Sequence, residues 1–530
     1  MEDNVYSLIK KVNGFPDAEK TYSPFFSSIG LCATENENGV GRMYFAYNAF
    51  TRALFEKTLD FGCALNTEKS SIYNLVFGED KVSLSFWKSD GIIIDCNGID
   101  NIGLFSKVSS STTDLWVDNC DGEYLILQGY SRNGDARDSD SRVNFVIGVR
   151  ALCGNLSNEN GMHARAVNGK ITLAICFEAL KATAKYVRSV LANAPADVDS
   201  AAKICHRWLK NNISGAEFET ENEDEASAAA YAAKELLFNM TKAQGELESF
   251  ITPFPSRGSK PYASLTDIFF LNYGYSALGC PLTKDFVKQV SHNRRPTGKI
   301  PSFMTSTWAC PGAPAQPFLG KAVINEIEYD YSFGWDTFSA IESNNKWWTS
   351  TAINKYGLVT DAYENKITAS LNALLLNQLR CAVDLAAQLG LEERDDKWKL
   401  ISANLEKNIV KYLYDKENNI FCDADTSMAT VLPSVSSSII ALWSGVEIEN
   451  SKALDMIRNC VLTIDNEKSI SPEYIFFKYQ LLKKYHFDDE AKKTSAEYIS
   501  TFTQDYKDGG EMADNSIACA LYLYLLDERS

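Results

Sequence analysis

The sequence lacks the features that mark membrane and nucleic-acid-binding proteins. Its apolar runs are too short to span a bilayer, and its first residues show no basic and apolar stretch typical of a secretory signal. Only 52 Lys and Arg stand against 69 Asp and Glu, which gives a formal net charge of -17. Phosphate backbones and anionic membranes bind clustered Lys and Arg, so neither suits this chain. We therefore expect a cytoplasmic protein with no nucleic-acid or membrane partner.

Histidine and paired cysteine are also scarce. The four histidines, His163, His206, His292 and His486, lie far apart, and the 13 cysteines occur singly with no CxxC pair. This pattern is typical of buried, reduced thiols and not of a disulfide framework or a zinc site. We expect no structural metal and no cofactor.

Length and apolar content, in contrast, are generous. The chain has 530 residues, of which 45% are hydrophobic and 12% aromatic. A chain of this size exceeds what one core normally organises, so two or more domains are expected.

The first third of the chain has the pattern of short strands. From about residue 25 to 180, segments rich in Val, Ile, Phe and Tyr alternate with Gly, Asn, Asp and Ser, without helical patterns between them. This spacing predicts an antiparallel β-sandwich, which we place at residues 1–177. The segments are MYFAYNAF, SIYNLVFG, KVSLSFW, GIIIDCNG, EYLILQGY, RVNFVIGVRAL and KITLAICFEAL.

The rest of the chain has the period of helices. Residues 178–225 suit a helical linker, and its acidic run ETENEDEAS is expected to be a solvated boundary. Beyond it, apolar residues recur as in Leu405, Ile409 and Leu413, one helical turn apart. The pattern predicts twelve helices, starting near residues 226, 263, 283, 315, 334, 366, 394, 431, 451, 471, 488 and 513.

Twelve helices with short connections can pair into six antiparallel hairpins. Hairpins that each bury one face can close into a double ring, and we predict such an (α/α)6 barrel over residues 226–530. An open solenoid is the alternative, but no repeat of fixed period is visible. In a closed ring, the loops before the inner helices would form a cup. Trp308, Trp347 and Trp348 lie in such loops and are expected to stack on sugars, whereas Trp398 and Trp443 suit the core.

Five segments, in consistent order over residues 226–530, resemble the six-hairpin glycosidases with an (α/α)6 barrel. The closest similarity is to the clan of trehalases and glycoside hydrolase family 63, which includes mannosylglycerate and glucosylglycerate hydrolases. The segments are SLTDIFFLNYG (264–274), GKIP (298–301) followed by QPF (316–318), ITASLNALLLNQL (367–379), SPEYIFFKYQLLKKYHF (471–487) and DGGEM (508–512).

The resemblance implies an inverting hydrolase with two carboxyl groups about 6.5 to 9.5 Å apart, one acting as acid and one as base. The matching positions are Asp361, in YGLVTDAYEN, as the acid and Glu511, after two glycines, as the base. Asp336 in SFGWDTF is the rival acid. The alternatives are a loop-capping role for Asp361, a surface helix position for Asp336, and a first-turn acid beside Asp514 for Glu511.

The resemblance also implies substrate contacts. Asp267, Arg257, Gln316 and Asn372 are expected to bind sugar hydroxyls, with helix capping by Asp267 and local backbone contacts for the others as the alternatives. Tyr474 takes the place of a family tryptophan. Other departures from the family pattern are Leu265 and Thr266 in place of a tryptophan, Ser370 in place of an aspartate, and Asp508 in place of a third glycine.

The leading hypothesis is an inverting α-glycosidase that acts on a small soluble glycoside or oligosaccharide. One alternative is a phosphorylase or rhamnosidase on the same architecture. Another is a catalytically inert carbohydrate-binding protein, which the altered tryptophans favour and the two carboxyl positions disfavour. The sequence leaves open the sugar, the linkage and whether the chain forms a homo-oligomer.

Overall fold

The computed structural model divides into two compact units. The first comprises Met1–Tyr262, Ala277–Cys280 and Thr305–Trp308, and the second comprises Ala263–Ser276, Pro281–Met304 and Ala309–Ser530. The residues that the structure describes are 8–11, 25, 29–33, 39–45, 55–108, 113–132, 142–179, 183–213, 218–243, 245, 247, 249–255, 262–305, 310–327, 330–362, 364–463 and 471–529.

The first unit contains two antiparallel sheets. The seven-stranded sheet carries most of the strands that the sequence predicts, in the order β4 (Leu75–Phe77), β5 (Val82–Lys88), β6 (Gly91–Asn97), β13 (Lys170–Ala179), β10 (Arg142–Cys153), β9 (Tyr124–Arg132) and β8 (Thr113–Cys120). The six-stranded sheet has the order β1 (Ile29–Ala33), β2 (Gly39–Phe45), β3 (Phe55–Asp60), β7 (Asn101–Val108), β12 (His163–Arg165) and β11 (Asn155–Ser157).

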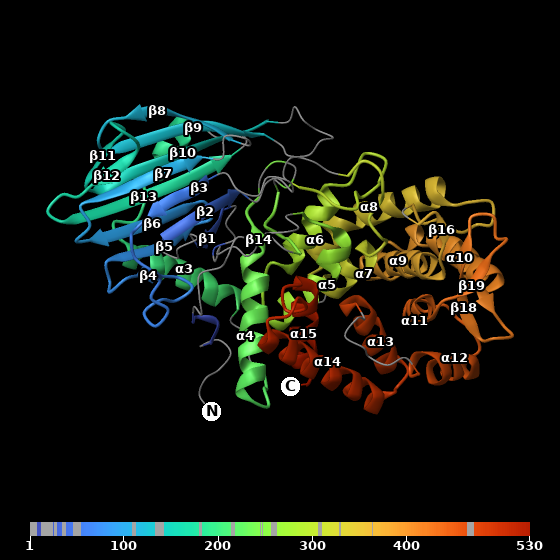
Figure 1. Ribbon diagram of the computed structural model, residues 1–530. Helices are drawn as coiled ribbons and strands as arrows, with labels where there is room; N and C mark the ends of the chain where they lie inside the picture. The colour runs from blue at the N-terminus through green and yellow to red at the C-terminus, as the bar shows by residue number, and fades with distance from the viewer. Residues whose placement is uncertain are drawn as a thin grey trace. The chain divides into compact units, whose positions relative to one another are not determined.

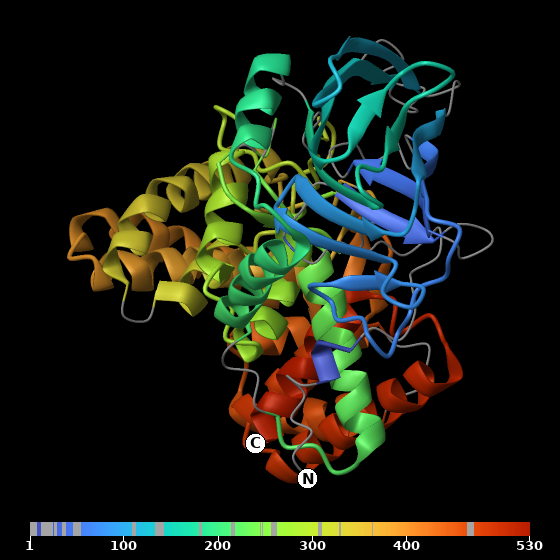
Figure 2. The ribbon, with the colours of Figure 1, turned by 90° about the vertical axis from the view of Figure 1, so that its left-hand side faces the viewer.

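The central strand β13 is buried on both faces, which explains its unbroken apolar run. Phe177 meets Phe105 of β7 edge to face, with ring centroids 6.1 Å apart. The opposite face packs against α2 (Ala184–Ala192) and α3 (Val198–Asn212), where Val187 and Leu191 join Ala174 in one buried cluster (Figure 2). Continuous hydrophobic strands are expected wherever both faces of a sheet are covered.

The acidic run at residues 219–227 leads into a helix. Helix α4 (Glu223–Phe238) starts there, and Asn222 Oδ1 accepts the Glu225 N–H at 2.9 Å. Glu225 is buried, and its carboxylate accepts the Glu221 N–H at 2.9 Å. The acids therefore cap the helix and face the positive end of its dipole. A short hairpin follows, β14 (Met240–Thr241) with β15 (Thr252–Pro253).

The second unit is helical (Figure 1). Together with α4, its helices begin within four residues of each of the twelve expected starts, the largest offsets being 319 against 315 and 435 against 431. The helices are α5 (Leu265–Ala277), α6 (Thr283–His292), α7 (Leu319–Ile327), α8 (Tyr331–Trp347), α9 (Ala369–Gln388), α10 (Asp396–Leu413), α11 (Val435–Trp443), α12 (Asn450–Met456), α13 (Pro472–Lys484), α14 (Asp488–Asp508) and α15 (Ser516–Arg529).

Alternate helices of this unit pack in succession. Helix α9 contacts α7 and α11, and α13 contacts α11 and α15. Tyr273 on α5 accepts a hydrogen bond from Asn325 of α7 at 2.8 Å and lies against Tyr524 of α15, with ring centroids 5.0 Å apart. Phe269 of α5 stacks on Phe318 just before α7. Aromatic packing thus links the first of these helices to both the second and the last.

A small sheet lies beside this succession. It contains β16 (Lys366–Ile367), β17 (Tyr414–Asp415), β18 (Ile420–Asp425) and β19 (Val431–Pro433), with β18 pairing to each of the others. Asp423 of β18 accepts the Ala369 N–H at 2.9 Å and the Ser437 hydroxyl at 2.7 Å. Its carboxylate therefore holds the starts of α9 and α11 together.

The sequence therefore predicted the coarse architecture, an antiparallel sheet region followed by a helical region. It missed β1, β3, β7, β8, β11 and β12. Strands β11 and β12 have only three residues each, and β3, β7 and β8 are interrupted by charged residues. Their neighbours in the sheets supply the hydrogen-bond partners that local pattern does not reveal.

Candidate active site

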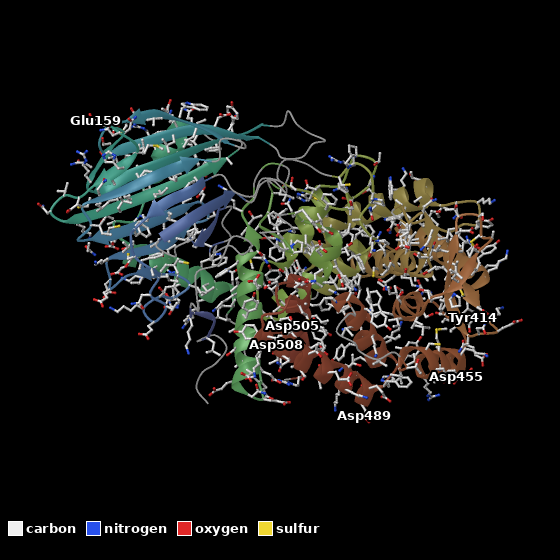
Figure 3. The ribbon with its side chains drawn as sticks, in the orientation of Figure 1. Glu159, Tyr414, Asp455, Asp489, Asp505 and Asp508 are labelled. Atoms are coloured by element: carbon white, nitrogen blue, oxygen red, sulfur yellow. The ribbon has the colours of Figure 1, made fainter. Side chains whose placement is uncertain are left out.

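The turn that carries Glu511 is built around Asp505. Helix α14 ends with Gly509 in the left-handed conformation, at φ 68°. The Asp505 carboxylate accepts the N–H groups of Met512 at 2.9 Å and Ala513 at 3.2 Å. A Cβ on Gly510 would lie 2.2 Å from that carboxylate, so only glycine fits there. Figure 3 shows Asp505 at the C-terminal end of α14.

Glu511 lies between the glycine pair and the two residues, Met512 and Ala513, whose N–H groups Asp505 accepts. Its side chain is exposed, and its carbonyl accepts the Asp514 N–H at 3.2 Å. The glycine pair therefore has two separate roles: Gly509 ends the helix and Gly510 makes room for Asp505. Together they present the Glu511 carboxylate to solvent immediately before α15. Sequence reasoning did not identify Asp505. The pattern that could have indicated it is an acidic residue a few positions before a glycine pair.

Asp361 lies in the connection between α8 and α9. It is half-buried, and its Oδ1 accepts the Glu364 N–H at 3.0 Å. Its backbone pairs with Lys366 at 2.7 Å and with Asn365 at 3.0 Å. The carboxyl group thus closes a short turn just before β16, as the loop-capping alternative anticipated.

Asn372 holds the Asp361 connection to α9. This side chain is fully buried; its Nδ2 donates to the carbonyls of Val359 at 3.0 Å and Thr368 at 2.8 Å. Its Oδ1 accepts the Val359 N–H at 2.7 Å. All of these partners are backbone groups, so the amide fixes the strand that leads into Asp361.

The paired tryptophans stand at the other end of the same connection. Trp348 is 2% exposed, and its indole Nε1 has no hydrogen-bond partner among the described residues. Trp347 is half-buried and meets Trp348 edge to face, with ring centroids 4.9 Å apart. The Lys299 ammonium lies 5.9 Å from the centre of the Trp347 ring. Trp347 is thus the more accessible stacking surface of the two.

The GKIP segment packs against α8 close to these tryptophans. Gly298 has a φ of 93°, and a Cβ there would lie 2.0 Å from the Ser343 carbonyl oxygen. Asn344 donates to the Gly298 carbonyl at 2.9 Å. The glycine is therefore required by both conformation and close approach. Lys299 also donates to the Pro311 carbonyl at 2.9 Å, which ties this segment to the loop before α7.

Three other predicted site residues begin or precede helices. Asp267 is in the first turn of α5, and Ser264 Oγ accepts its N–H at 3.4 Å, so Ser264 takes the capping position that the alternative gave to Asp267. Gln316 is exposed before α7. Burial raises the pKa of Tyr474, in the first turn of α13, to about 12, and its hydroxyl has no partner among the described residues.

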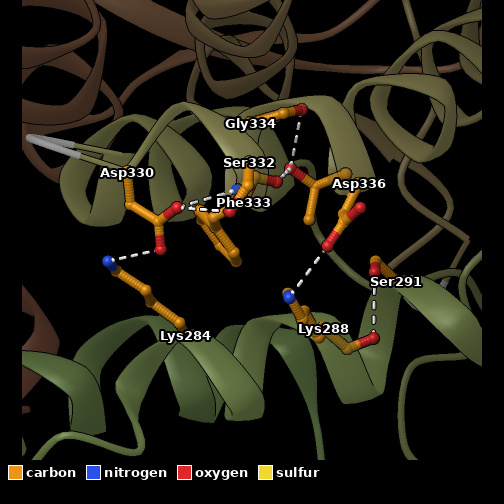
Figure 4. A network of polar contacts seen from close by, with 9 residues as sticks. Lys284, Lys288, Ser291, Asp330, Ser332, Phe333, Gly334 and Asp336 are labelled. Carbon is orange, nitrogen blue, oxygen red and sulfur yellow. Dashed lines mark hydrogen bonds and ion pairs between the residues drawn. The ribbon is translucent and has the colours of Figure 1, made fainter.

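Asp336 lies apart from the other candidates. It is on the surface of α8, and its Oδ2 pairs with Lys288 of α6 at 3.0 Å (Figure 4). Asp330, which caps α8, pairs in the same way with Lys284 at 2.8 Å. Asp336 therefore forms part of the junction between the two helices. Arg257 and Trp308 lie outside the described residues.

The structure gathers some of the candidates and separates others. Asp361 and Trp348 lie in the connection between α8 and α9, Trp347 ends α8, and Asn372 lies in the first turn of α9. Glu511 belongs to the α14–α15 connection. Across the described ranges, no three His, Cys, Asp or Glu side chains cluster as metal ligands would. Within the same ranges, each helix is too short or too polar to cross a membrane.

Comparisons with known proteins relate the chain to carbohydrate-active enzymes. A family model described as Trehalase matches residues 338–474, which include Asp361. A search of curated protein sequences gives no match. Similar solved structures include a candidate kojibiose phosphorylase from the human microbiome, with a TM-score of 0.57 at 12% identity, covering 98% of this chain and 86% of that chain.

Two further solved structures are similar to this chain. An inverting mannosidase of glycoside hydrolase family 92 from Bacteroides thetaiotaomicron has a TM-score of 0.53 at 10% identity, covering 100% of this chain and 86% of that one. A family 63 mannosylglycerate hydrolase from Thermus thermophilus has a TM-score of 0.47 at 14% identity, covering 56% of this chain and 99% of that one.

The family match over residues 338–474 confirms the resemblance to the trehalase clan. At sequence identities of 10% and 12%, these structural matches indicate a similar fold and nothing further. The family match supports a glycoside hydrolase or a related carbohydrate-active enzyme.

Proposed function

We propose that the protein is an inverting α-glycosidase that hydrolyses a small soluble glycoside or oligosaccharide, with Asp361 as acid and Glu511 as base. The observation that carries the proposal is the trehalase match over residues 338–474, which spans the Asp361 connection. The likeness of the whole chain to an inverting mannosidase adds support at the level of the fold.

The proposed architecture is an N-terminal β-sandwich over residues 1–177, a helical linker over 178–225 and an (α/α)6 barrel over 226–530. Contact between Phe105 and Phe177 of different sheets supports the sandwich. The succession of contacts from α7 to α15, together with the Tyr273–Tyr524 contact, supports ring closure. In such a ring α5, α7, α9, α11, α13 and α15 are the inner helices.

This arrangement gives the two carboxyl groups a shared cup. In a ring of antiparallel hairpins, the connections that enter the inner helices open on one face. Asp361 enters α9 and Glu511 enters α15, three hairpins apart, so they would face each other across the ring. Inversion requires about 6.5 to 9.5 Å between such groups, to leave room for a water molecule.

The proposed chemistry is a single displacement. Asp361, in its protonated form, donates its proton to the glycosidic oxygen as the bond from that oxygen to the anomeric carbon breaks. Glu511, in its ionised form, accepts a proton from the water that attacks the anomeric carbon from the opposite face. The configuration of that carbon inverts. Before the next turnover Asp361 takes a proton from solvent and Glu511 releases its proton to solvent.

The remaining candidates have supporting roles in this proposal. Trp347 would stack on the sugar, and the unpartnered hydroxyl of Tyr474 is free to bind one of its hydroxyls. Asp267, Gln316, Arg257, Trp308 and Trp348 remain proposed substrate contacts. Asn372 instead positions the Asp361 connection, since its amide is already bound to backbone.

Asp336 stays the second candidate acid. Its place on the outer surface of α8, paired with Lys288, makes it the weaker of the two, because a general acid must reach the leaving oxygen.

A phosphorylase is the second candidate function, favoured by the whole-chain likeness to the candidate kojibiose phosphorylase. A phosphorolytic site needs cations for phosphate where a hydrolase has its base. Residues 509–515 contain no Lys or Arg and do contain Glu511, which favours hydrolysis. An inert carbohydrate-binding protein is the third, favoured by Leu265 and Thr266 where the family has tryptophan.

A cytoplasmic location is also part of the proposal. The cysteines of the described residues are free, as expected in a reducing compartment.

Incubation with α-glucosides, α-mannosides, trehalose and glycosylglycerates, with and without phosphate, tests the function. The proposal expects sugar release without phosphate, and loss of roughly 100-fold or more of the rate in both Glu511→Gln and Asp361→Asn. Asp514→Asn, in the same turn as Glu511, is the matched control and should retain activity. Release that depends on phosphate would identify a phosphorylase, and no release by the folded protein would favour the inert alternative.

A further inference from the structure

Helix α8 exposes two large aromatic side chains on one face. Tyr331 is 62% exposed and Trp335 is 52% exposed. They are four residues apart, so their rings project from neighbouring positions of one helix face. Ser332 and Ser339 are exposed on the same face. These four residues are called the α8 strip below.

The charges that border the α8 strip are paired. On one side Lys284 binds Asp330 at 2.8 Å and Lys288 binds Asp336 at 3.0 Å (Figure 4). The Lys284 hydrogen bond holds the pKa of Asp330 below its usual value, so that pair stays ionic at neutral pH. About two helical turns beyond Trp335 along α8, Arg394 binds Glu342. The strip therefore offers aromatic faces and hydroxyl groups between mutually neutralised charges.

The size of the α8 strip suits a small ligand better than a protein. A stable protein interface buries about 800 Å² on each partner. Two aromatic side chains of about 150 to 250 Å² each, roughly half exposed, present far less apolar surface than that. Ion pairs and serines surround them, so the apolar area does not extend further.

We infer that the α8 strip is a second binding site for neutral oligosaccharides, separate from the candidate active site. Flat aromatic faces stack on the apolar faces of sugar rings, and the serine hydroxyls and the bordering carboxylates and ammonium groups hydrogen-bond their hydroxyls. Trp335 lies twelve residues before Trp347 on one helix, which places it about 18 Å along the axis. The choice of a sugar as the occupant draws on the proposed function, whereas the site itself rests on the exposed rings.

Calorimetric titration of the full chain with maltoheptaose, linear mannohexaose and a charged oligogalacturonate tests this inference. The Glu511→Gln variant serves as the parent, so that hydrolysis does not consume the ligand. A neutral oligosaccharide should bind, and the added double change Tyr331→Ala with Trp335→Ala should raise the Kd of that site at least tenfold. Leu400→Ala, which removes another exposed apolar side chain at 65% exposure, is the matched control and should leave binding unchanged.

Three results would overturn the inference. The first is that neither maltoheptaose nor mannohexaose binds. The second is that the double change leaves the Kd of the neutral oligosaccharide unchanged. The third is a dimer, seen by analytical ultracentrifugation, that the double change dissociates. Thermal melting checks that the variants are folded. If the protein binds an oligosaccharide at the α8 strip but hydrolyses no substrate, the binding site is supported and the proposed function is wrong.

Discussion

The turn after α14 shows how a single side chain can arrange a reactive group. Asp505 binds the backbone on the far side of Glu511, and Gly510 leaves space for that carboxylate. The turn is therefore defined by hydrogen bonds that do not involve Glu511 itself. A proposed base fixed in this way loses little entropy when it meets its substrate.

Removal of the Asp505 carboxylate should slow catalysis more than it weakens binding. In Asp505→Ala the N–H groups of Met512 and Ala513 lose their acceptor, and the turn that carries Glu511 loosens. We expect kcat to fall about 10- to 100-fold, with KM within about twofold. Asp508→Ala is the control, because Asp508 binds only the exposed Gln504 side chain at 2.9 Å. Equal values of kcat and KM in the two variants would show that Asp505 does not position Glu511.

Removal of the buried Asn372 amide should destabilise the helical unit. Asn372→Ala leaves the Val359 N–H and carbonyl unpaired in the interior, at a cost of about 1 to 3 kcal/mol for each unsatisfied group. Denaturant unfolding measures the loss. Asn377→Ala should lose much less, because Asn377, on the same helix, makes only long contacts among the described residues: it donates to the Ser444 carbonyl at 3.5 Å and accepts from the Cys381 thiol at 3.7 Å. Similar losses in both would mean that Asn372 does not hold the Asp361 connection.

Among the elements, the helices were the most predictable. Their period is local, so each begins within four residues of its expected start. The acidic run before α4 is mostly exposed, as expected, but its sequence did not reveal that Asn222 caps the helix. Strand β7 was missed because its partners, β3 and β12, are distant in the sequence. Strand β8 was missed although its partner β9 directly follows it, because charged and polar residues interrupt its apolar pattern.

The first unit contains a buried cluster of charged side chains that the sequence pattern did not predict. Lys242 follows β14 and binds Asp90 at 2.7 Å and Glu178 of β13 at 3.0 Å. Asp90 also binds Lys88 at 2.9 Å. Burial, together with the neighbouring Asp90, raises the pKa of Glu178 to about 8. The buried thiol of Cys176 and the ring of Tyr186 complete the titratable surroundings.

The cluster predicts a dependence of stability on pH. Since the folded pKa of Glu178 is raised, the folded state holds a proton that the unfolded state releases above its ordinary pKa of 4.5. Stability from this group is therefore lost as pH rises from about 4.5 to about 8. Between pH 6 and 9 we expect the melting temperature to fall by about 3 °C more in the native protein than in Glu178→Gln. Parallel melting curves for the two proteins would contradict this.

At the scale of the whole molecule, order along the chain was more informative than any one motif. The trehalase match covers residues 338–474, whereas Glu511 lies beyond it. The segment order linked the two carboxyl positions, because the proposed ring would place the connections to α9 and α15 on one face. Asp336 lies on the surface of α8, paired with Lys288, and stays the second candidate acid. A short string such as SFGWDTF does not specify which face of a helix each of its side chains occupies.

Substrate identity depends on features that the sequence could not supply. The loops that contain Arg257 and Trp308 are outside the described residues, and Tyr474 replaces a family tryptophan. Stacking strength and hydroxyl partners at these positions decide which sugar fits. Fold and carboxyl positions therefore predict a reaction class, and the sugar must come from experiment.

The central claim is that a water molecule held by Glu511 attacks opposite the bond that Asp361 protonates. Proton NMR during the first minutes of hydrolysis, before mutarotation, tests this most directly on whichever α-glycoside of the panel is cleaved. The account predicts that the released sugar first appears as the β-anomer, and that the α-anomer grows in later. First appearance of the α-anomer would contradict it, since retention would require a covalent intermediate instead of a directly attacking water.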